Sequence, residues 1–446
     1  MKTLAALFAL SLLFVNPYLR GDGNGYYAWL RSPLIDGDVD FGNEYLRADP
    51  FFRAGFVDEA GRPTPAMTTP LGKAENQWSI GPAMLWLPFF AAAHALALAG
   101  AAVPDGYAPI YLWFVAIGTA IYGFLALVLG AALARAMGAG RWAAGAAAAV
   151  LGASSLPVYM YLLPFHVHAL AAFACALYFW WGLARLEGWR PRDWAIWGAC
   201  AGLMAAVYFI HGLFLAVAAW RLLAPGAPRA KGTAAAAFVL GAAPFAALHL
   251  WSRLALYGSV TTGYRDEFFF LSPRLLATAF SPEHGLFLWT PVLLIALAGL
   301  AALARRDPRA RVLLAAWALL FYVIASYQNW HGQSSFGNRF FVSLTPAFVV
   351  GIAASLAWLE TRARLLPAAL VALLCLWNAG FVFQWGLNIV PSRGPVDFRE
   401  VARNQVTVVP SRIGSTTMRY FTGRRGFTRE IEEGDARERD GYRLRR

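Results

Sequence analysis

Residues 16–45 read NPYLRGDGNGYYAWLRSPLIDGDVDFGNEY, and they follow the apolar residues 3–15 with almost no break. The chain changes there from a segment that would dissolve in lipid to one that is rich in acids. The stretch places five carboxylates just past the first hydrophobic segment: Asp22, Asp36, Asp38, Asp40 and Glu44. Because buried carboxylates are costly unless they are paired or used, this boundary is where the functional question starts.

The composition indicates a membrane protein. Of 446 residues, 59% are hydrophobic and 14% are charged, whereas soluble domains carry about 25% charged residues. Apolar stretches of about 20 residues recur along the chain, which is the length that crosses a bilayer core. The alternating ten-residue segments of a β-barrel are absent. The net charge of +13 favours arginines in cytoplasmic loops over a nucleic-acid partner.

Hydropathy and charge together predict an all-α polytopic fold with about eleven transmembrane helices. The arginine-bearing loops should be cytoplasmic, which places residues 20–107, the first outer loop, outside. The apolar spans are 4–19, 81–102, 108–134, 142–160, 167–184, 194–209, 211–224, 233–257, 285–304, 312–327, 340–359 and 366–388.

The segment 81–102 conflicts with this alternation, because a full crossing would turn the arginine-rich loops outward. We therefore expect it to be re-entrant or to lie at the membrane interface, and Pro82, Pro88 and Pro104 fit a broken path. Residues 1–388 then form the transmembrane domain. Residues 389–446, which carry both charge signs and no long apolar run, form an extracytoplasmic tail.

This topology gathers the unusual polar residues on the outer face. Candidate substrate-binding residues there are Lys73, Asn76, Tyr26, His166, His168, Trp330 and Arg339. Simpler interpretations exist for several of them. The acidic run is also typical of a solvated loop, two histidines beside a proline are often interfacial, and an arginine can anchor a helix end.

The acidic run also suggests a cation site. Asp36, Asp38, Asp40 and Glu44 are hard oxygen ligands suited to magnesium or manganese. A calcium-binding EF-hand is disfavoured, because Phe41 stands where that loop needs glycine and Arg47 where it needs glutamate.

Several motifs resemble the GT-C superfamily of membrane glycosyltransferases, which includes protein O-mannosyltransferases and the lipid A aminoarabinose transferase. The stretch DGNGYYAWLRSPLIDGDVDFGNEY is similar to its bacterial members, as are NQWSIGPAMLWLPFF and SFGNRFFVSLTPAF. The resemblance covers residues 1 to about 390. The Lys-Pro-Pro element of the mannosyl and aminoarabinose enzymes is absent, and Lys73 stands near its expected place.

The resemblance implies a polyprenyl-phosphate-linked sugar donor, a cell-envelope acceptor and an inverting transfer on the outer face of a bacterial inner membrane. Asp22 matches the family's catalytic aspartate in position, and Asp38 is the second candidate. Gly21, Gly23 and Gly25 would let the backbone turn tightly and a sugar approach closely. The alternative for Asp22 is that it merely caps a helix that begins near Asn24.

Other functions are less well matched. A multi-pass transporter or lipid flippase would place charges near the middle of the spans and would show internal repeats, and few such charges and no clear repeat are present. A protease or acyltransferase is disfavoured because HExxH and GxSxG are absent. A structural scaffold would not need the one-sided polar set.

Overall fold

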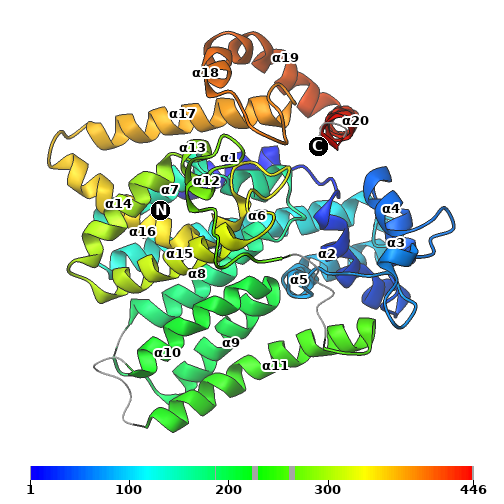
Figure 1. Cartoon of the computed structure of the whole chain (residues 1–446), viewed down its shortest axis with the longest axis horizontal. Helices are drawn as coiled ribbons and strands as arrows, with labels where there is room; N and C mark the ends of the chain where they lie inside the picture. The colour runs from blue at the N-terminus through cyan, green and yellow to red at the C-terminus, as the bar shows by residue number, and fades with distance from the viewer. Residues whose placement is uncertain (1, 186, 224–229, 261–266, 444–446) are drawn as a thin grey trace. The chain divides into compact units, whose positions relative to one another are not determined.

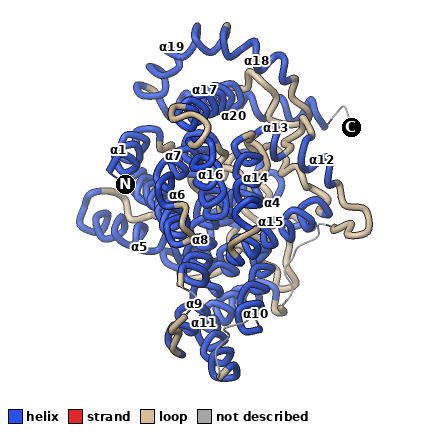
Figure 2. Tube along the Cα trace, turned by 90° about the vertical axis from the view of Figure 1, so that its left-hand side faces the viewer, coloured by secondary structure: helices blue, strands red, loops and turns tan. Residues whose placement is uncertain are grey.

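The structure is a computed structural model that describes residues 2–185, 187–223, 230–260 and 267–443. Over those residues the fold is built from helices without a strand, as Figure 2 shows, and the all-α prediction is confirmed. The chain divides into two compact units, residues 7–126 with 159–265 and residues 1–6 with 127–158 and 266–446. We call them the loop unit and the C-terminal unit.

The loop unit contains the acidic stretch. Its helices are α2 (Asp22–Arg31), α3 (Gly42–Leu46), α4 (Pro50–Phe56), α5 (Gly81–Leu96), α8 (His168–Ala184), α9 (Pro191–Val207), α10 (Leu215–Leu223) and α11 (Lys231–Tyr257) (Figure 1). Helices α9 and α11 touch backbone to backbone. A Cβ on Gly198 would lie 1.9 Å from the carbonyl oxygen of Phe238, so glycine is what permits this close helix pair.

The C-terminal unit is a second helical bundle. Its helices are α7 (Ala143–Ala153), α12 (Leu275–Phe280), α13 (Leu286–Trp289), α14 (Val292–Ala304), α15 (Pro308–Ser326), α16 (Thr345–Glu360), α17 (Leu366–Gly386), α18 (Phe398–Val406), α19 (Val408–Thr422) and α20 (Arg424–Arg443). Helices α14 and α16 meet through Gly299 and Gly351, where an added Cβ on Gly299 would lie 2.0 Å from the Gly351 carbonyl oxygen. The boundary between the units falls inside α1 (Lys2–Ser11) and α6 (Pro109–Ala136).

Six helices in the described part of the chain are long and apolar enough to cross a membrane. They are Gly81–Ala101, Pro109–Ala136, Lys231–Tyr257, Pro308–Ser326, Arg339–Glu360 and Leu366–Gly386. Four shorter apolar helices accompany them: Lys2–Phe14, His168–Ala184, Phe209–Leu223 and Val292–Ala304. The protein therefore has the helices of a multi-pass membrane protein, while eleven crossings stay a prediction.

The segment 81–102 is helical from Gly81 to Ala101, with a kink at Gly100 near its end. Pro88 lies inside α5, and a π-helical turn extends the helix to Ala101, with Gly100 at φ 93°. Whether it is re-entrant or lies at the membrane interface stays a prediction.

Two other spans are interrupted where a single helix was expected. Helix α7 ends at Ala153, where Ser154 donates its hydroxyl to the carbonyl of Val150, a contact that competes with helix continuation. Thr290 separates α13 from α14. It precedes Pro291, and the proline ring disfavours helical dihedral angles in the residue before it. Apolar composition alone does not reveal either break.

The predicted tail contains three helices. Residues 398–443 form α18, α19 and α20, which belong to the C-terminal unit; α18 and α19 pack on α17, and α20 packs on α19 (Figure 1). Residues 444–446 of the predicted tail lie outside the described residues. The side of the membrane on which these helices lie stays a prediction.

Candidate functional site

A glycine turn presents Asp22 at the start of α2. Gly21 occupies the N-cap position with φ 53° and ψ −136°, a backbone conformation that glycine adopts more readily than other residues. Asp22 is half-buried in the first helical turn, where the unpaired N–H groups of the helix favour a negative charge. The alternative that Asp22 caps a helix starting near Asn24 is wrong, because the helix begins at Asp22 itself.

Asp49, which the sequence analysis missed, holds this turn. Its Oδ2 accepts hydrogen bonds from the backbone N–H of Gly21 and from Nδ2 of Asn24, both at 3.1 Å. The Asn24 amide also donates to the Gly21 carbonyl at 3.0 Å. The sequence held a signal for Asp49, since an aspartate directly before a proline is typical of a helix start. In the structure Asp49 caps α4 by accepting a hydrogen bond from the N–H of Phe52.

The predicted histidine pair lies against the same turn. The rings of His166 and His168 are both buried, and their centroids are 6.4 Å apart. The centroid of the Tyr159 ring lies 6.2 Å from that of His166 and 4.7 Å from that of His168. A Cβ added to Gly21 would lie 3.7 Å from Nε2 of His166. The turn that carries Asp22 is thus brought beside the histidine pair, which lies more than 140 positions further along the chain.

A third histidine extends this group. The Tyr208 ring lies 6.1 Å from that of His168 and 5.2 Å from that of His211. His211 is fully buried, and within the described residues neither of its ring nitrogens has a hydrogen-bond partner. We call Asp22, Asp49, His166, His168 and His211 the acid–histidine cluster.

The other two glycines of α2 serve packing. A Cβ on Gly25 would lie 1.9 Å from the Trp78 ring, and one on Gly23 would lie 2.7 Å from Cβ of Phe165. Protein side chains therefore fill the space beside these two glycines, where the sequence suggested that a sugar could approach. Only Gly21, at the turn, keeps the predicted role in backbone geometry.

Asn76 and Tyr26 are interior residues. Asn76 donates to the carbonyl of Gly25 at 2.9 Å and accepts from the N–H of Trp78 at 3.1 Å, so both ends of its buried amide have partners. Tyr26 is buried, and its ring forms a T-shaped pair with that of Trp78, with the centroids 6.3 Å apart. In this arrangement both residues position α2.

Helix α11 supplies a cation that the sequence analysis did not select. Arg253 is buried and donates to the carbonyls of Asn76 at 3.3 Å and Trp78 at 3.2 Å. Lys73 is half-buried, and its Nζ donates to the Ala255 carbonyl at 3.0 Å. A single charge within the apolar span 233–257 was the available signal for Arg253.

The acids at 36–44 are bound by their own loop. Arg31 pairs with Asp36 and, at 2.6 Å, with the buried Glu44. Asp38 accepts from the Ser32 hydroxyl at 2.6 Å and from the N–H of Asp40, while Asp40 accepts from the N–H of Gly42. Within the described residues no three His, Cys, Asp or Glu side chains form a metal-holding group. The structure therefore does not assemble the four predicted ligands, and metal dependence stays a prediction.

Burial and pairing act in opposite directions on these carboxyls. Burial raises the pKa of Glu44, and the Arg31 guanidinium offsets only part of that change. Burial would also raise the pKa of Asp36, but hydrogen bonds from Asn43 and Arg31 bring it below its ordinary value. Arg31 also donates to the Asp105 carbonyl at 2.8 Å, which ties the acidic run to the turn that precedes α6.

The C-terminal unit holds the last two predicted residues. Trp330 is buried and its carbonyl accepts from Asn338 at 2.9 Å. Arg339 is half-buried over the Phe340 ring at 5.7 Å. His331 lies nearby in the same loop, 3.8 Å from the carboxylate of Glu283. Burial, followed by the charge of His331, lowers the pKa of the neighbouring His284 to about 3, so this imidazole is neutral.

Comparison with solved structures gave a match to an archaeal protein. The archaeal oligosaccharyltransferase AglB from Archaeoglobus fulgidus, in complex with an inhibitory peptide and a dolichol-phosphate, matches with a TM-score of 0.44 and 13% identity. The match covers 92% of this chain and 54% of that one, so this chain spans about half the length of AglB. No protein-family model and no curated protein matched. The function proposed below therefore rests on this chain's own residues.

Proposed function

We propose that this protein is a membrane glycosyltransferase that moves a sugar from a polyprenyl-phosphate donor to a hydroxyl acceptor at the outer face of a bacterial inner membrane. The observation that carries the proposal is the acid–histidine cluster at the turn that follows the first apolar helix. A half-buried carboxylate at a helix N-terminus beside buried imidazoles is a suitable place for proton transfer.

The reaction is a single inverting displacement. The acceptor oxygen forms a bond to the anomeric carbon while the bond from that carbon to the phosphate oxygen breaks. Asp22 takes the proton that leaves the acceptor hydroxyl, and polyprenyl phosphate departs with the electron pair. Asp49 has no part in this proton transfer, because its Oδ2 already accepts two hydrogen bonds, and it positions the turn.

The departing phosphate needs a cation. Lys73 is the candidate in the loop unit, since its ammonium group has three donors and the Ala255 carbonyl uses one. Arg339 is the candidate in the C-terminal unit. The two are proposed separately, and each is tested by its own variant.

The partners of the charged side chains bear on the metal site and on the transporter alternative. The proposal includes no metal step, because Arg31 and the loop backbone occupy the predicted ligands. A transporter would use charges near the middle of a span. Arg253 is the buried charge of α11, but it lies four residues from the end of that helix and is bonded to loop carbonyls.

The deciding experiment supplies purified protein with a panel of polyprenyl-phosphate sugars and an acceptor extract, and measures released polyprenyl phosphate. We expect release with at least one donor, and loss of release in Asp22→Asn. If the folded protein releases no polyprenyl phosphate from any donor but moves labelled lipid across vesicle membranes, the transferase proposal is wrong and the flippase alternative takes its place.

The outer-face assignment has its own test. Gln77 and Val103 are exposed at the two ends of α5, and the native cysteines are buried or half-buried. Gln77→Cys and Val103→Cys should both react with an impermeant maleimide added outside. Labelling from opposite sides would show that α5 crosses and would reverse the side assigned to every later loop.

A further inference from the structure

The C-terminal helices are fixed on α17 by side-chain contacts to backbone. Gln405 donates to the Trp377 carbonyl at 2.9 Å, and Gln384 donates to the Val401 carbonyl at 3.1 Å. Asn388, with φ 54°, donates to the Ile431 carbonyl of α20 at 3.0 Å. These bonds set α18–α20 in defined positions within the C-terminal unit.

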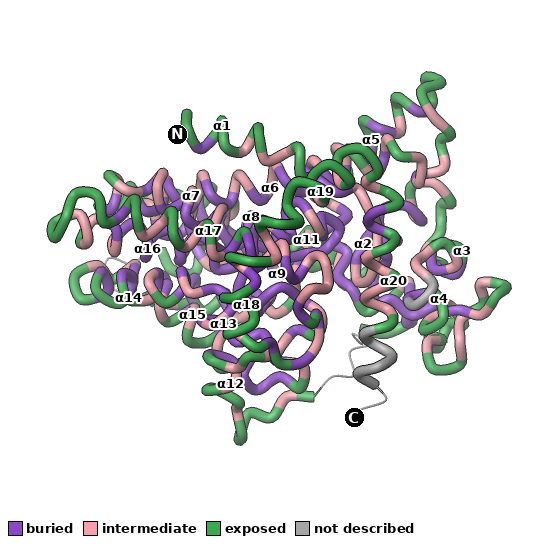
Figure 3. The backbone as a smooth tube through the Cα atoms, turned by 90° about the horizontal axis from the view of Figure 1, so that it is seen from above, coloured by how far each residue is buried: buried purple, intermediate pink, exposed green. Residues whose placement is uncertain are grey.

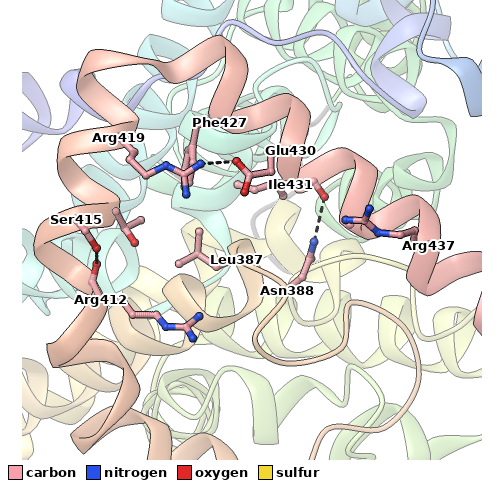
Figure 4. A pocket seen from close by; sticks show the side chains of 11 residues that line it. Leu387, Asn388, Arg412, Ser415, Arg419, Phe427, Glu430, Ile431 and Arg437 are labelled. Carbon is pink, nitrogen blue, oxygen red and sulfur yellow. Dashed lines mark hydrogen bonds and ion pairs between the residues drawn. The ribbon is translucent and has the colours of Figure 1, made fainter.

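A pocket of about 490 Å³ lies between the end of α17, α19 and α20 (Figure 4). That volume is within the range of small-ligand sites, roughly 300–1,000 Å³. Its apolar side chains are Leu387, Phe427 and Ile431, and its charged side chains are Arg412, Arg419, Arg437 and Glu430. Three arginines against one glutamate leave the pocket with a surplus of positive charge.

The arginines differ in how they are held. Arg419 pairs with Glu430 and lies over the Phe427 ring at 4.9 Å. Within the described residues the guanidinium groups of Arg412 and Arg437 have no hydrogen-bond or ion-pair partner. Figure 4 shows them on opposite sides of Leu387 and Asn388. The pocket thus has one fixed cation and two that are available to a ligand.

Helix α19 separates its polar and apolar faces around this pocket. Arg412, Ser415, Thr416 and Arg419 line it, with the spacing i, i+3, i+4 and i+7 of one helix face. Ile413, Met418 and Phe421 point elsewhere and are exposed, as is most of α19 in Figure 3. A basic face combined with exposed apolar side chains is typical of helices at an anionic lipid surface.

We propose that this pocket binds a phosphate group. Guanidinium groups pair with phosphate through parallel hydrogen bonds, and the phosphate charge would balance the two unpaired arginines. Two sources share this chemistry, the headgroup of an anionic phospholipid and a soluble phosphate. The site is separate from the acid–histidine cluster and does not depend on the proposed transferase activity.

The test uses the full chain in detergent and follows thermal unfolding as each probe is titrated. The probes are phosphatidylglycerol, phosphatidylcholine and inorganic phosphate, since a ligand that binds the folded state raises the unfolding temperature. We expect a saturable rise with phosphatidylglycerol or with inorganic phosphate. Arg412→Ala with Arg437→Ala should weaken that response by about tenfold or more, as expected for lost charged hydrogen bonds.

The control is Arg425→Ala, which removes an exposed arginine of α20 that does not line the pocket. Arg437→Gln, at an exposed position, serves if the double variant does not fold. Response to inorganic phosphate assigns a soluble ligand, and response to phosphatidylglycerol alone assigns a lipid headgroup. An equal response to phosphatidylcholine, an equal loss in Arg425→Ala, or no response to any probe would overturn the proposal.

Discussion

Asp22 and the acids at 36–44 stand in one loop, yet their surroundings are of two kinds. The acids at 36–44 are satisfied locally, by Arg31, Ser32 and backbone N–H groups. Asp22 stands at a turn that Asp49 holds from a distance, next to His166 and the buried ring of His168. An acid-rich sequence therefore combines one group with a structural role and one whose surroundings suit proton transfer.

The two groups of acids differ in where their partners lie along the chain more than in residue type. Arg31 follows directly from α2 and reaches acids only five and thirteen residues away. The histidines reach the Gly21 turn from the second segment of the loop unit, which begins at residue 159. Local pairing neutralises the first group, whereas the second group exists only because the chain folds back.

The largest expected effect is on stability, in Arg31→Ala. This variant leaves Glu44 and Asp36 without their cation, and removing one partner of a buried pair costs about 3–5 kcal/mol. Unfolding in detergent at neutral pH would measure it. Arg47→Ala is the control, because its exposed pair with Asp105, at 3.4 Å, contributes at most about 1 kcal/mol. Equal losses in both variants would remove the distinction between the two acidic groups.

The next effect is on turnover, in Asp22→Asn. The amide keeps the shape of the side chain but cannot take a proton, so the transfer rate should fall by about 10²-fold or more with folding intact. Asp38→Asn is the matched change in the other group, and it should stay within a few-fold of wild type. If Asp38→Asn is the inactive variant, the base lies in the acidic run and the comparison is reversed.

Donor affinity should respond to the cations. Lys73→Ala or Arg339→Ala should weaken donor binding by roughly 1.5–3 kcal/mol, the range for a lost charged hydrogen bond. Equilibrium binding of a labelled polyprenyl-phosphate sugar would measure it. Arg62→Ala, which removes an exposed ion pair with Asp58, is the control. Unchanged affinity in both test variants would leave the phosphate contact with other residues.

The smallest effect is on the pH dependence of stability, and its sign differs within the loop. The raised pKa of Glu44 makes the folded state bind the proton more tightly, so stability should fall as pH rises above about 4.5. Asp105 is the opposite case. Burial opposes its ionisation, but the N–H groups of Tyr107 and Ala108 and the Arg47 side chain lower its pKa. Its contribution is therefore lost as pH falls below its ordinary value of 3.8.

Unfolding profiles of Glu44→Gln and Asp105→Asn should separate these effects. Glu44→Gln should flatten the profile on the neutral side, and Asp105→Asn should flatten it on the acid side. A profile that changes on the same side in both variants would contradict the opposite signs.

The sequence predicted the class of fold because composition and span length are additive properties of the chain. It also selected Asp22, His166 and His168 as site candidates, and the structure places the Gly21 turn before Asp22 beside His166, while their roles stay predictions. It did not single out Asp49 or Arg253, because a sequence pattern reveals that a polar group is present and not which backbone atom it meets. The substrate-binding roles of Asn76 and Tyr26 stay predictions.

By itself, the sequence determined that this chain is helical, apolar enough for a membrane, and acidic at one boundary. Those features depend on residue type and on spacing along the chain. The tertiary structure decided which acids are neutralised, because an ion pair or hydrogen bond depends on distances of about 3 Å that hydropathy does not encode. It likewise placed Arg412 and Arg437 around one pocket, by packing α19 and α20 on the end of α17.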